Sequence, residues 1–208
     1  MLRLTRLALE AFLAEGVKAF VIACNTATSA AAARLREEYP ALPIIGAEPA
    51  IKPAAEAFPG GRILMLATPM TTREEKFHRL HEKYAGQAQI IPIPCEGLME
   101  YVEQGILEGS EVESYLTRKL SPYLDKSVDA VVLGCTHYPF LRGAIRNVVG
   151  PKPVILDGSR GIAEQLRRQL TERQLLNPQE TGRVELRSSL DDPAVLSLAR
   201  RLLEAELP

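Results

Sequence analysis

Tryptophan is absent from this 208-residue sequence, and aromatic residues make up only 5% of it. Side chains on which nucleic acid bases could stack are therefore scarce. The 25 Lys and Arg residues nearly cancel the 26 Asp and Glu residues, so no positive field attracts a polyanion or an anionic membrane. These shortages exclude nucleic acid and the membrane surface from the expected partners.

Long apolar runs are also missing. No stretch approaches the roughly 18 apolar residues of a membrane span, and Glu10 and Glu15 interrupt the N-terminal stretch too early for a signal peptide. The three cysteines are odd in number and widely spaced, which argues against a disulfide framework and favours a reducing compartment. We therefore expect a cytoplasmic protein, and at 46% apolar residues it can bury a substantial core.

Short apolar runs alternate with helical patterns along almost the whole sequence, and Pro59-Gly60-Gly61 separates two such series. Thr71 or Thr72, each followed three residues later by Glu, could open a helix with a capping box. The alternation predicts an α/β fold with mainly parallel sheets. Strands are expected at residues 19–23, 44–45, 63–66, 89–93, 128–133 and 154–156, with a weak one at 184–186.

Two stretches share one plan: an apolar strand, a small residue, a cysteine, polar residues and a helix. Cys24 follows the strand at 19–23, and Cys135 follows the strand at 128–133. Sites in such folds form at the carboxyl ends of strands, and the amino end of a helix favours a thiolate. We therefore expect Cys24 and Cys135 to face each other across one site, where one removes a proton and the other delivers one.

The residues alone leave other interpretations open. A free cysteine is commonly a buried core residue, which could describe Cys24 and also describes Cys95. A zinc site built from the three cysteines and His137 would lack the usual C-x-x-C spacing. A Cys–His hydrolase built on Cys135 and His137 is a further alternative, although residues two apart at a strand end generally point different ways.

Ala23-Cys-Asn-Thr-Ala-Thr28 and Gly134-Cys-Thr-His-Tyr-Pro139 resemble the two signature motifs of bacterial glutamate racemase, in the aspartate/glutamate racemase superfamily. The separation of the two cysteines also suits that family. Further stretches agree with it: Gly46-Ala-Glu-Pro49, Ala67-Thr-Pro-Met-Thr71 and Cys95-Glu-Gly-Leu-Met-Glu-Tyr-Val-Glu103. The resemblance extends over nearly the whole chain, and both motifs in order are a specific signal.

This resemblance implies a cofactor-independent interconversion of L- and D-glutamate, which supplies D-glutamate for peptidoglycan. It also implies two pseudo-symmetric three-layer α/β domains with the substrate between them. We expect residues 1–55 plus 158–208 to form the first domain and residues 56–157 the second. The expected partners are glutamate and, in a homodimer, a second copy of the chain; no cofactor or metal is expected.

The resemblance also assigns roles to individual residues. Cys24 and Cys135 match the two acid/base thiols, and His137 and Glu103 match the groups that assist the second thiol. Without the resemblance, Glu103 would read as a solvated helix carboxylate. The expected substrate-binding residues are Asn25, Thr26 and Thr136 at the carboxylate and amino groups, and Thr68 and Thr71 near the side-chain carboxylate.

The start of the sequence departs from the family pattern. Family members begin with a strand ending in Asp-Ser-Gly, followed by a Pro-Tyr-Gly loop, and this sequence has neither motif there. We expect a racemase sequence shortened at its start by a mis-assigned initiation site, truncation or gene decay. Severely reduced activity and an exposed apolar edge would follow. The alternatives are a racemase acting on aspartate or hydantoins, and a non-catalytic remnant that binds an amino acid.

Overall fold

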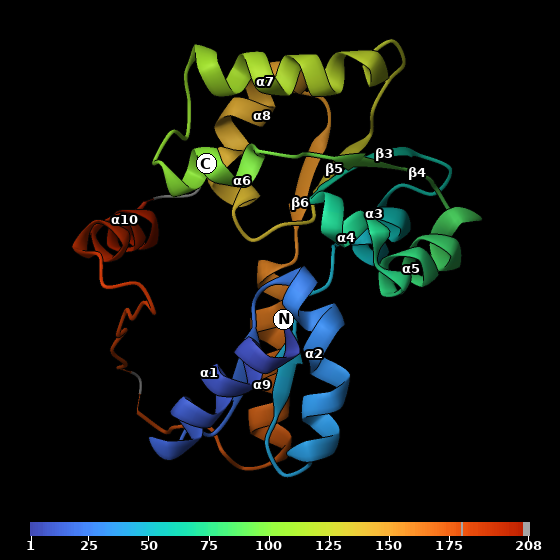
Figure 1. The fold of residues 1–208 in the computed structure, drawn as a ribbon. Helices are drawn as coiled ribbons and strands as arrows, with labels where there is room; N and C mark the ends of the chain where they lie inside the picture. Colours follow the sequence, from blue (N-terminus) through green and yellow to red (C-terminus); the bar gives the residue numbers. More distant parts are fainter. Residues whose placement is uncertain (180, 206–208) are drawn as a thin grey trace.

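The computed structural model describes residues 1–179 and 181–205, which form two α/β units with parallel sheets (Figure 1). In chain order the elements are α1 (Leu2–Ala14), β1 (Phe20–Ile22), α2 (Asn25–Glu38), β2 (Ile44–Gly46), α3 (Ile51–Ala57), β3 (Arg62–Ala67), α4 (Pro69–Arg73), α5 (Glu75–Ala85), β4 (Gln89–Pro94), α6 (Leu98–Glu103), α7 (Ser110–Leu120), η1 (Ser121–Tyr123), β5 (Ala130–Leu133), η2 (Tyr138–Leu141), α8 (Arg142–Val149), β6 (Val154–Asp157), α9 (Ser159–Glu172) and α10 (Pro193–Glu204). The predicted fold class is confirmed.

The larger sheet has the strand order β4-β3-β5-β6, and its strands pair in parallel throughout. The side chains of strand β3 are buried on both faces of this sheet. Leu64 and Leu66 point into a core shared with α6, α7 and α8, whereas Ile63 and Met65 point into a second core under α3 and α5. Side chains that alternate along a strand can only all be buried when helices cover both faces.

The smaller sheet pairs β1 with β2, also in parallel. Helix α2 packs on this pair, and α1 packs on α2 through the fully buried Leu9. Helix α9 returns from β6 to lie beside β2 (Figure 1). The opposite side of α1 carries exposed Leu4 and Leu7. A homodimer through such a surface remains a prediction.

The division into residues 1–55 plus 158–208 and residues 56–157 remains a proposal, and packing suggests two refinements of it. Ile51 and Ala54 of α3 belong to a core of the larger sheet. Leu202 of α10 packs against the core around α6 and α7, although α9 lies in the other unit (Figure 1). None of the helices within residues 1–179 and 181–205 is long and apolar enough to cross a membrane.

Two local predictions were wrong. Residues 184–186 do not form a strand; Val184 is 70% exposed, so this segment lacks the neighbouring strand that would satisfy its backbone. The capping residue after β3 is Thr68 rather than Thr71 or Thr72. Its Oγ1 accepts a hydrogen bond from the Thr71 backbone N–H at 3.2 Å, and Pro69 occupies the first turn of α4.

Candidate active site

Cys135 lies in the loop that follows β5, one residue beyond Gly134. The Gly134 backbone approaches β3 closely, because its N–H donates to the Leu66 carbonyl at 2.7 Å. A Cβ at Gly134 would lie 2.8 Å from that same oxygen and 2.5 Å from Met65 Cε. Only glycine therefore lets the chain leave β5 along this path, which sets the position of the thiol.

The loop after Cys135 turns at once, and Tyr138 begins the short η2 helix. This turn brings Cys135 Sγ to 3.7 Å from Nδ1 of His137. The expectation that residues two apart would point different ways was wrong, because Cys135 and His137 lie beyond the end of the strand and in a turn. The thiol and the imidazole therefore meet.

Glu103, the last residue of α6, completes this arrangement. Its Oε1 lies 2.7 Å from Nε2 of His137. If Nε2–H donates to the carboxylate, Nδ1 is left as an acceptor that faces the Cys135 thiol. The structure thus joins Cys135, His137 and Glu103 in one line of hydrogen bonds, although Glu103 is 34 residues away from His137 in sequence.

Burial raises the pKa of the Cys135 thiol to about 11. Backbone N–H groups of His137, Tyr138 and Thr136 favour the thiolate, but they do not overcome desolvation; charge on Cys24 would raise the pKa of Cys135 further. The helix end therefore favours the thiolate, as expected, but desolvation outweighs it and the net shift of the pKa is upward. At neutral pH this sulfur carries its proton.

Cys24 should be the first cysteine to react with iodoacetamide at neutral pH, because its side chain is exposed. Cys135 should react slowly, since a pKa near 11 against an ordinary thiol value of 9.0 lowers its thiolate fraction roughly 100-fold. Its rate should rise as the pH approaches 11. Peptide mapping by mass spectrometry measures both rates; equal labelling at neutral pH would contradict the burial argument.

Cys24 forms the amino-terminal cap of α2, where its sulfur accepts a hydrogen bond from the Ala27 backbone N–H at 3.5 Å. Its exposure excludes the interpretation of Cys24 as a core residue. Cys95, by contrast, is buried, and burial raises the pKa of its thiol to about 12. Cys95 is therefore the structural cysteine of the three.

Asn25 links the two cysteine loops. Its Nδ2 donates to the carbonyl of Gly134 at 2.5 Å, so the residue after Cys24 holds the residue before Cys135. This bond fixes which end of the amide is the oxygen. Within the described residues, Asn25 Oδ1 is the buried side-chain N or O atom without a hydrogen-bond partner. Sequence reasoning placed Asn25 in the site but did not foresee this bridge.

Three of the predicted threonines gather in a chain of hydroxyl groups. Thr26 Oγ1 lies 3.2 Å from Thr71 Oγ1, which in turn lies 3.0 Å from Thr68 Oγ1. Thr26 and Thr71 are buried, so these bonds join the start of α2 to the start of α4. Thr136 is exposed beside Cys135 and takes no part in this chain.

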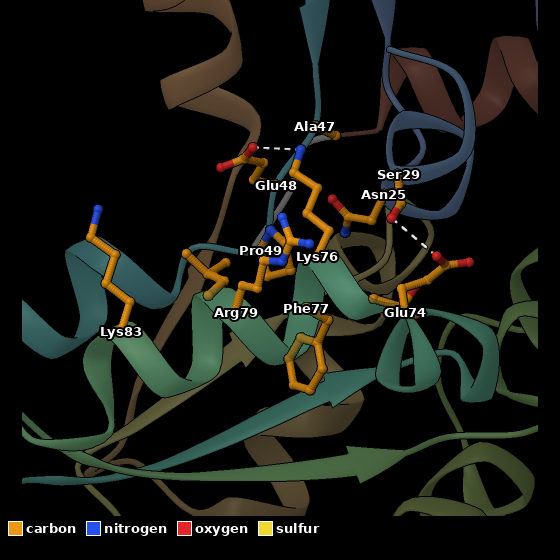
Figure 2. Close-up of a pocket in the computed structure, with 12 residues that line it drawn as sticks. Asn25, Ser29, Ala47, Glu48, Pro49, Glu74, Lys76, Phe77, Arg79 and Lys83 are labelled. Carbon is orange, nitrogen blue, oxygen red and sulfur yellow. Dashed lines mark hydrogen bonds and ion pairs between the residues drawn. The ribbon is translucent and has the colours of Figure 1, made fainter. Parts of the chain in front are cut away.

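Two polar contacts that sequence reasoning missed lie nearby. Ser29 donates to Glu74 at 3.1 Å, and Lys76 pairs with Glu48 at 2.6 Å (Figure 2). A cavity of about 240 Å³ lies between these contacts, and its lining includes Asn25 but neither Cys24 nor Cys135. The thiols, rather than the cavity, therefore mark the candidate reacting centre. These pairs join distant segments, so no local sequence signal identifies them.

Within the described residues, no group of three His, Cys, Asp or Glu side chains is arranged to hold a metal ion. Cys95 Sγ donates to the Ile93 carbonyl at 3.4 Å rather than joining the other two thiols. The site that the structure brings together thus consists of Cys24, Asn25, Cys135, His137 and Glu103. These groups can exchange protons without a metal.

Residues 3–166 match the family model described as Asp/Glu/Hydantoin racemase. The chain belongs to this racemase family. Glutamate racemase of Clostridium perfringens is 46% identical over 198 residues, which cover 95% of this chain and 76% of that protein. The chain is thus similar to a glutamate racemase along nearly its whole length.

Solved glutamate racemases share the fold. The enzyme from Thermus thermophilus, in complex with beta-chloro-D-alanine, superimposes on this chain with a TM-score of 0.77 at 32% identity. The superposition covers 98% of this chain and 75% of the Thermus enzyme. The enzyme from Francisella tularensis, in complex with D-glutamate, gives a TM-score of 0.78 at 25% identity, with 95% and 73% covered. The family fold predicted from the two cysteine motifs is therefore confirmed.

Proposed function

We propose that this chain is a glutamate racemase, an isomerase that interconverts L- and D-glutamate by proton transfer between two thiols. The arrangement that carries the proposal is the pair of cysteine loops held together by Asn25, with Cys135 backed by His137 and Glu103. D-glutamate made in this way would serve peptidoglycan synthesis in the cytoplasm. The identity to glutamate racemases over nearly the whole chain supports this choice of substrate.

The chemistry needs an acid and a base on opposite faces of the α-carbon. The α-proton of glutamate is much less acidic than a thiol, so the carbanion requires a preorganised polar environment. When Cys24 removes the proton from one enantiomer, Cys135 delivers a proton to the other face. Cys135 suits the acid role because its raised pKa keeps its proton in place at neutral pH.

The reverse reaction requires Cys135 to act as the base. Its proton can move to Nδ1 of His137, 3.7 Å away, while Glu103 holds the opposite nitrogen at 2.7 Å. The carboxylate stabilises the imidazolium that forms. We infer that His137 and Glu103 are what allow the buried thiol to work in both directions.

Asn25 contributes an acceptor for the substrate amine. Its Oδ1 is buried without a partner, and the bond from Nδ2 to Gly134 prevents the amide from turning over. A donor such as an α-ammonium group satisfies this oxygen. We assign Thr26, Thr136, Thr68 and Thr71 to positioning the substrate carboxylates, in accordance with the family resemblance.

We further propose that turnover is slow. In the part of the chain that the structure describes, Cys24 accepts one hydrogen bond, from Ala27. No carboxylate or imidazole there forms a hydrogen bond with Cys24, whereas His137 does so with Cys135. Since neighbouring acid–base groups tune a catalytic thiol, proton transfer at Cys24 should limit the rate.

Exchange of the α-proton tests the proposal. L- or D-glutamate incubated with the protein in heavy water should gain deuterium at the α-carbon, and circular dichroism should show loss of optical activity. The nuclear magnetic resonance signal of the α-proton measures the exchange. A matched incubation with aspartate tests the alternative substrate.

Two results would overturn the proposal in different ways. Thermal stabilisation by glutamate without any α-proton exchange would identify a protein that binds an amino acid but does not turn it over. Faster exchange with aspartate or a hydantoin than with glutamate would assign the chain to another branch of the family.

A further inference from the structure

Helix α10 lies beside α6 (Figure 1) and contacts the turn that ends it, and α6 carries Glu103 at its last position. A Cβ at Gly105 would lie 3.0 Å from Arg201 Nη2 and 3.5 Å from Leu198 Cδ1. The C-terminal helix therefore touches the chain two residues beyond the carboxylate that holds His137.

The turn itself is tightly closed. Gly105 has φ +75°, and its N–H donates to the Val102 carbonyl at 2.9 Å, while the next N–H, of Ile106, donates to the Tyr101 carbonyl at 2.8 Å. These bonds join the turn to the end of α6, so a displacement of the turn would also displace Glu103. Helix α6 has only six residues, so its position as a whole depends on the elements packed against it rather than on its own stability.

Helix α10 buries little apolar surface against the rest of the protein. Val195, Leu198, Ala199 and Leu202 form a half-buried stripe at helical spacing, and no residue of α10 is fully buried. Leu202 packs against the core that also receives Tyr101, Ile106 and Leu107 beside α6. Few buried apolar contacts mean that α10 can leave this position at a small cost in free energy.

The segment before α10 connects this contact to the other unit. It leaves α9, and Arg187 within it forms ion pairs with Glu15 just after α1. Residues 181–192 contain no helix or strand along this path. The ion pair of Arg187 therefore ties the segment that leads into α10 to the unit that contains α1.

We propose that α10 is a positioning element that holds Glu103 against His137 and thereby controls proton transfer at Cys135. Glu103 needs such support, because its side chain is 56% exposed and its bond to His137 competes with water. Neither Leu198 nor Leu202 touches the reacting atoms. Both act through the turn at Gly105.

Replacing Leu198 or Leu202 by Asp should release α10 while leaving the rest of the fold intact. Leu203→Asp is the matched control, because Leu203 is 55% exposed on the same helix. The nitrogen-15 resonance of His137 Nε2 should move in the first two variants and stay unchanged in the control. The chain has three histidines, so His78 and His81 serve as internal references.

Catalysis supplies the second measurement, and this part rests on the proposed function. Racemisation kcat should fall roughly tenfold in Leu198→Asp with little change in KM. The substitution displaces Glu103 from His137 but leaves the residues that bind the substrate in place. The same substitution in a Glu103→Ala background should have no further effect.

An additive effect in the Glu103→Ala background, or an unmoved His137 resonance, would overturn the proposal. The resonance does not depend on turnover. A shifted resonance in a protein that exchanges no α-proton would uphold the positioning contact while rejecting the racemase function.

Discussion

Replacing either Cys24 or Cys135 by serine is expected to lower glutamate racemisation by at least about 100-fold, because each substitution removes the acid or base from one face of the α-carbon. A serine hydroxyl is far too weak an acid to substitute for a thiol in this role. The measurement is the loss of optical activity of purified L- or D-glutamate.

The same variants should separate inversion from exchange. With one thiol left, a proton can be removed and returned only on that thiol's face, so one enantiomer should still gain deuterium without being inverted. Cys24→Ser and Cys135→Ser should retain exchange of opposite enantiomers. If the same enantiomer exchanged in both variants, the thiols would not act on opposite faces.

Cys95→Ser is the matched control. It makes the same chemical change at the third thiol, which is buried and bonded to the Ile93 carbonyl. A hydroxyl can retain this bond, so the variant should racemise glutamate at the rate of the unmodified chain. Loss of activity in Cys95→Ser equal to the other two would indicate a general effect on folding.

Gly134→Ala is expected to lower both stability and activity. The added Cβ would lie 2.8 Å from the Leu66 carbonyl, and that oxygen cannot retreat because it accepts the Gly134 N–H at 2.7 Å. Overpacking of this kind costs about 1–3 kcal/mol. The displaced loop would carry Cys135 and His137 together away from Glu103 and Cys24, which lie on other segments, and this should reduce racemisation by roughly 10- to 100-fold.

Thermal unfolding and racemisation measure the two effects. Gly86→Ala provides the control, since a Cβ there would meet no atom within 4 Å and the residue has an ordinary helical conformation. That variant should unfold within about 0.5 kcal/mol of the unmodified chain. A Gly134→Ala protein as stable and active as Gly86→Ala would show that the loop after β5 adapts freely.

Much of the fold follows from short-range patterns. Apolar runs such as Ile63–Leu66 and Val131–Leu133 alternate with helical stretches, which predicted the parallel sheet. Residues 184–186 had a similar local pattern but formed no strand, because a strand also needs a neighbour to pair with. Local patterns therefore predict which segments can be strands, and packing selects among them.

The candidate site divides in the same way. The sequence by itself determined that thiols follow two parallel strands and that His137 lies next to one of them. Tertiary structure alone decided that Cys135 is protonated and that α10 lies against the turn beyond Glu103. It also shows the direct contact between Glu103 and His137, which only the family resemblance had grouped together. A thiol's pKa depends on burial, and these contacts join segments far apart in the chain, so neither is encoded in any local stretch of residues.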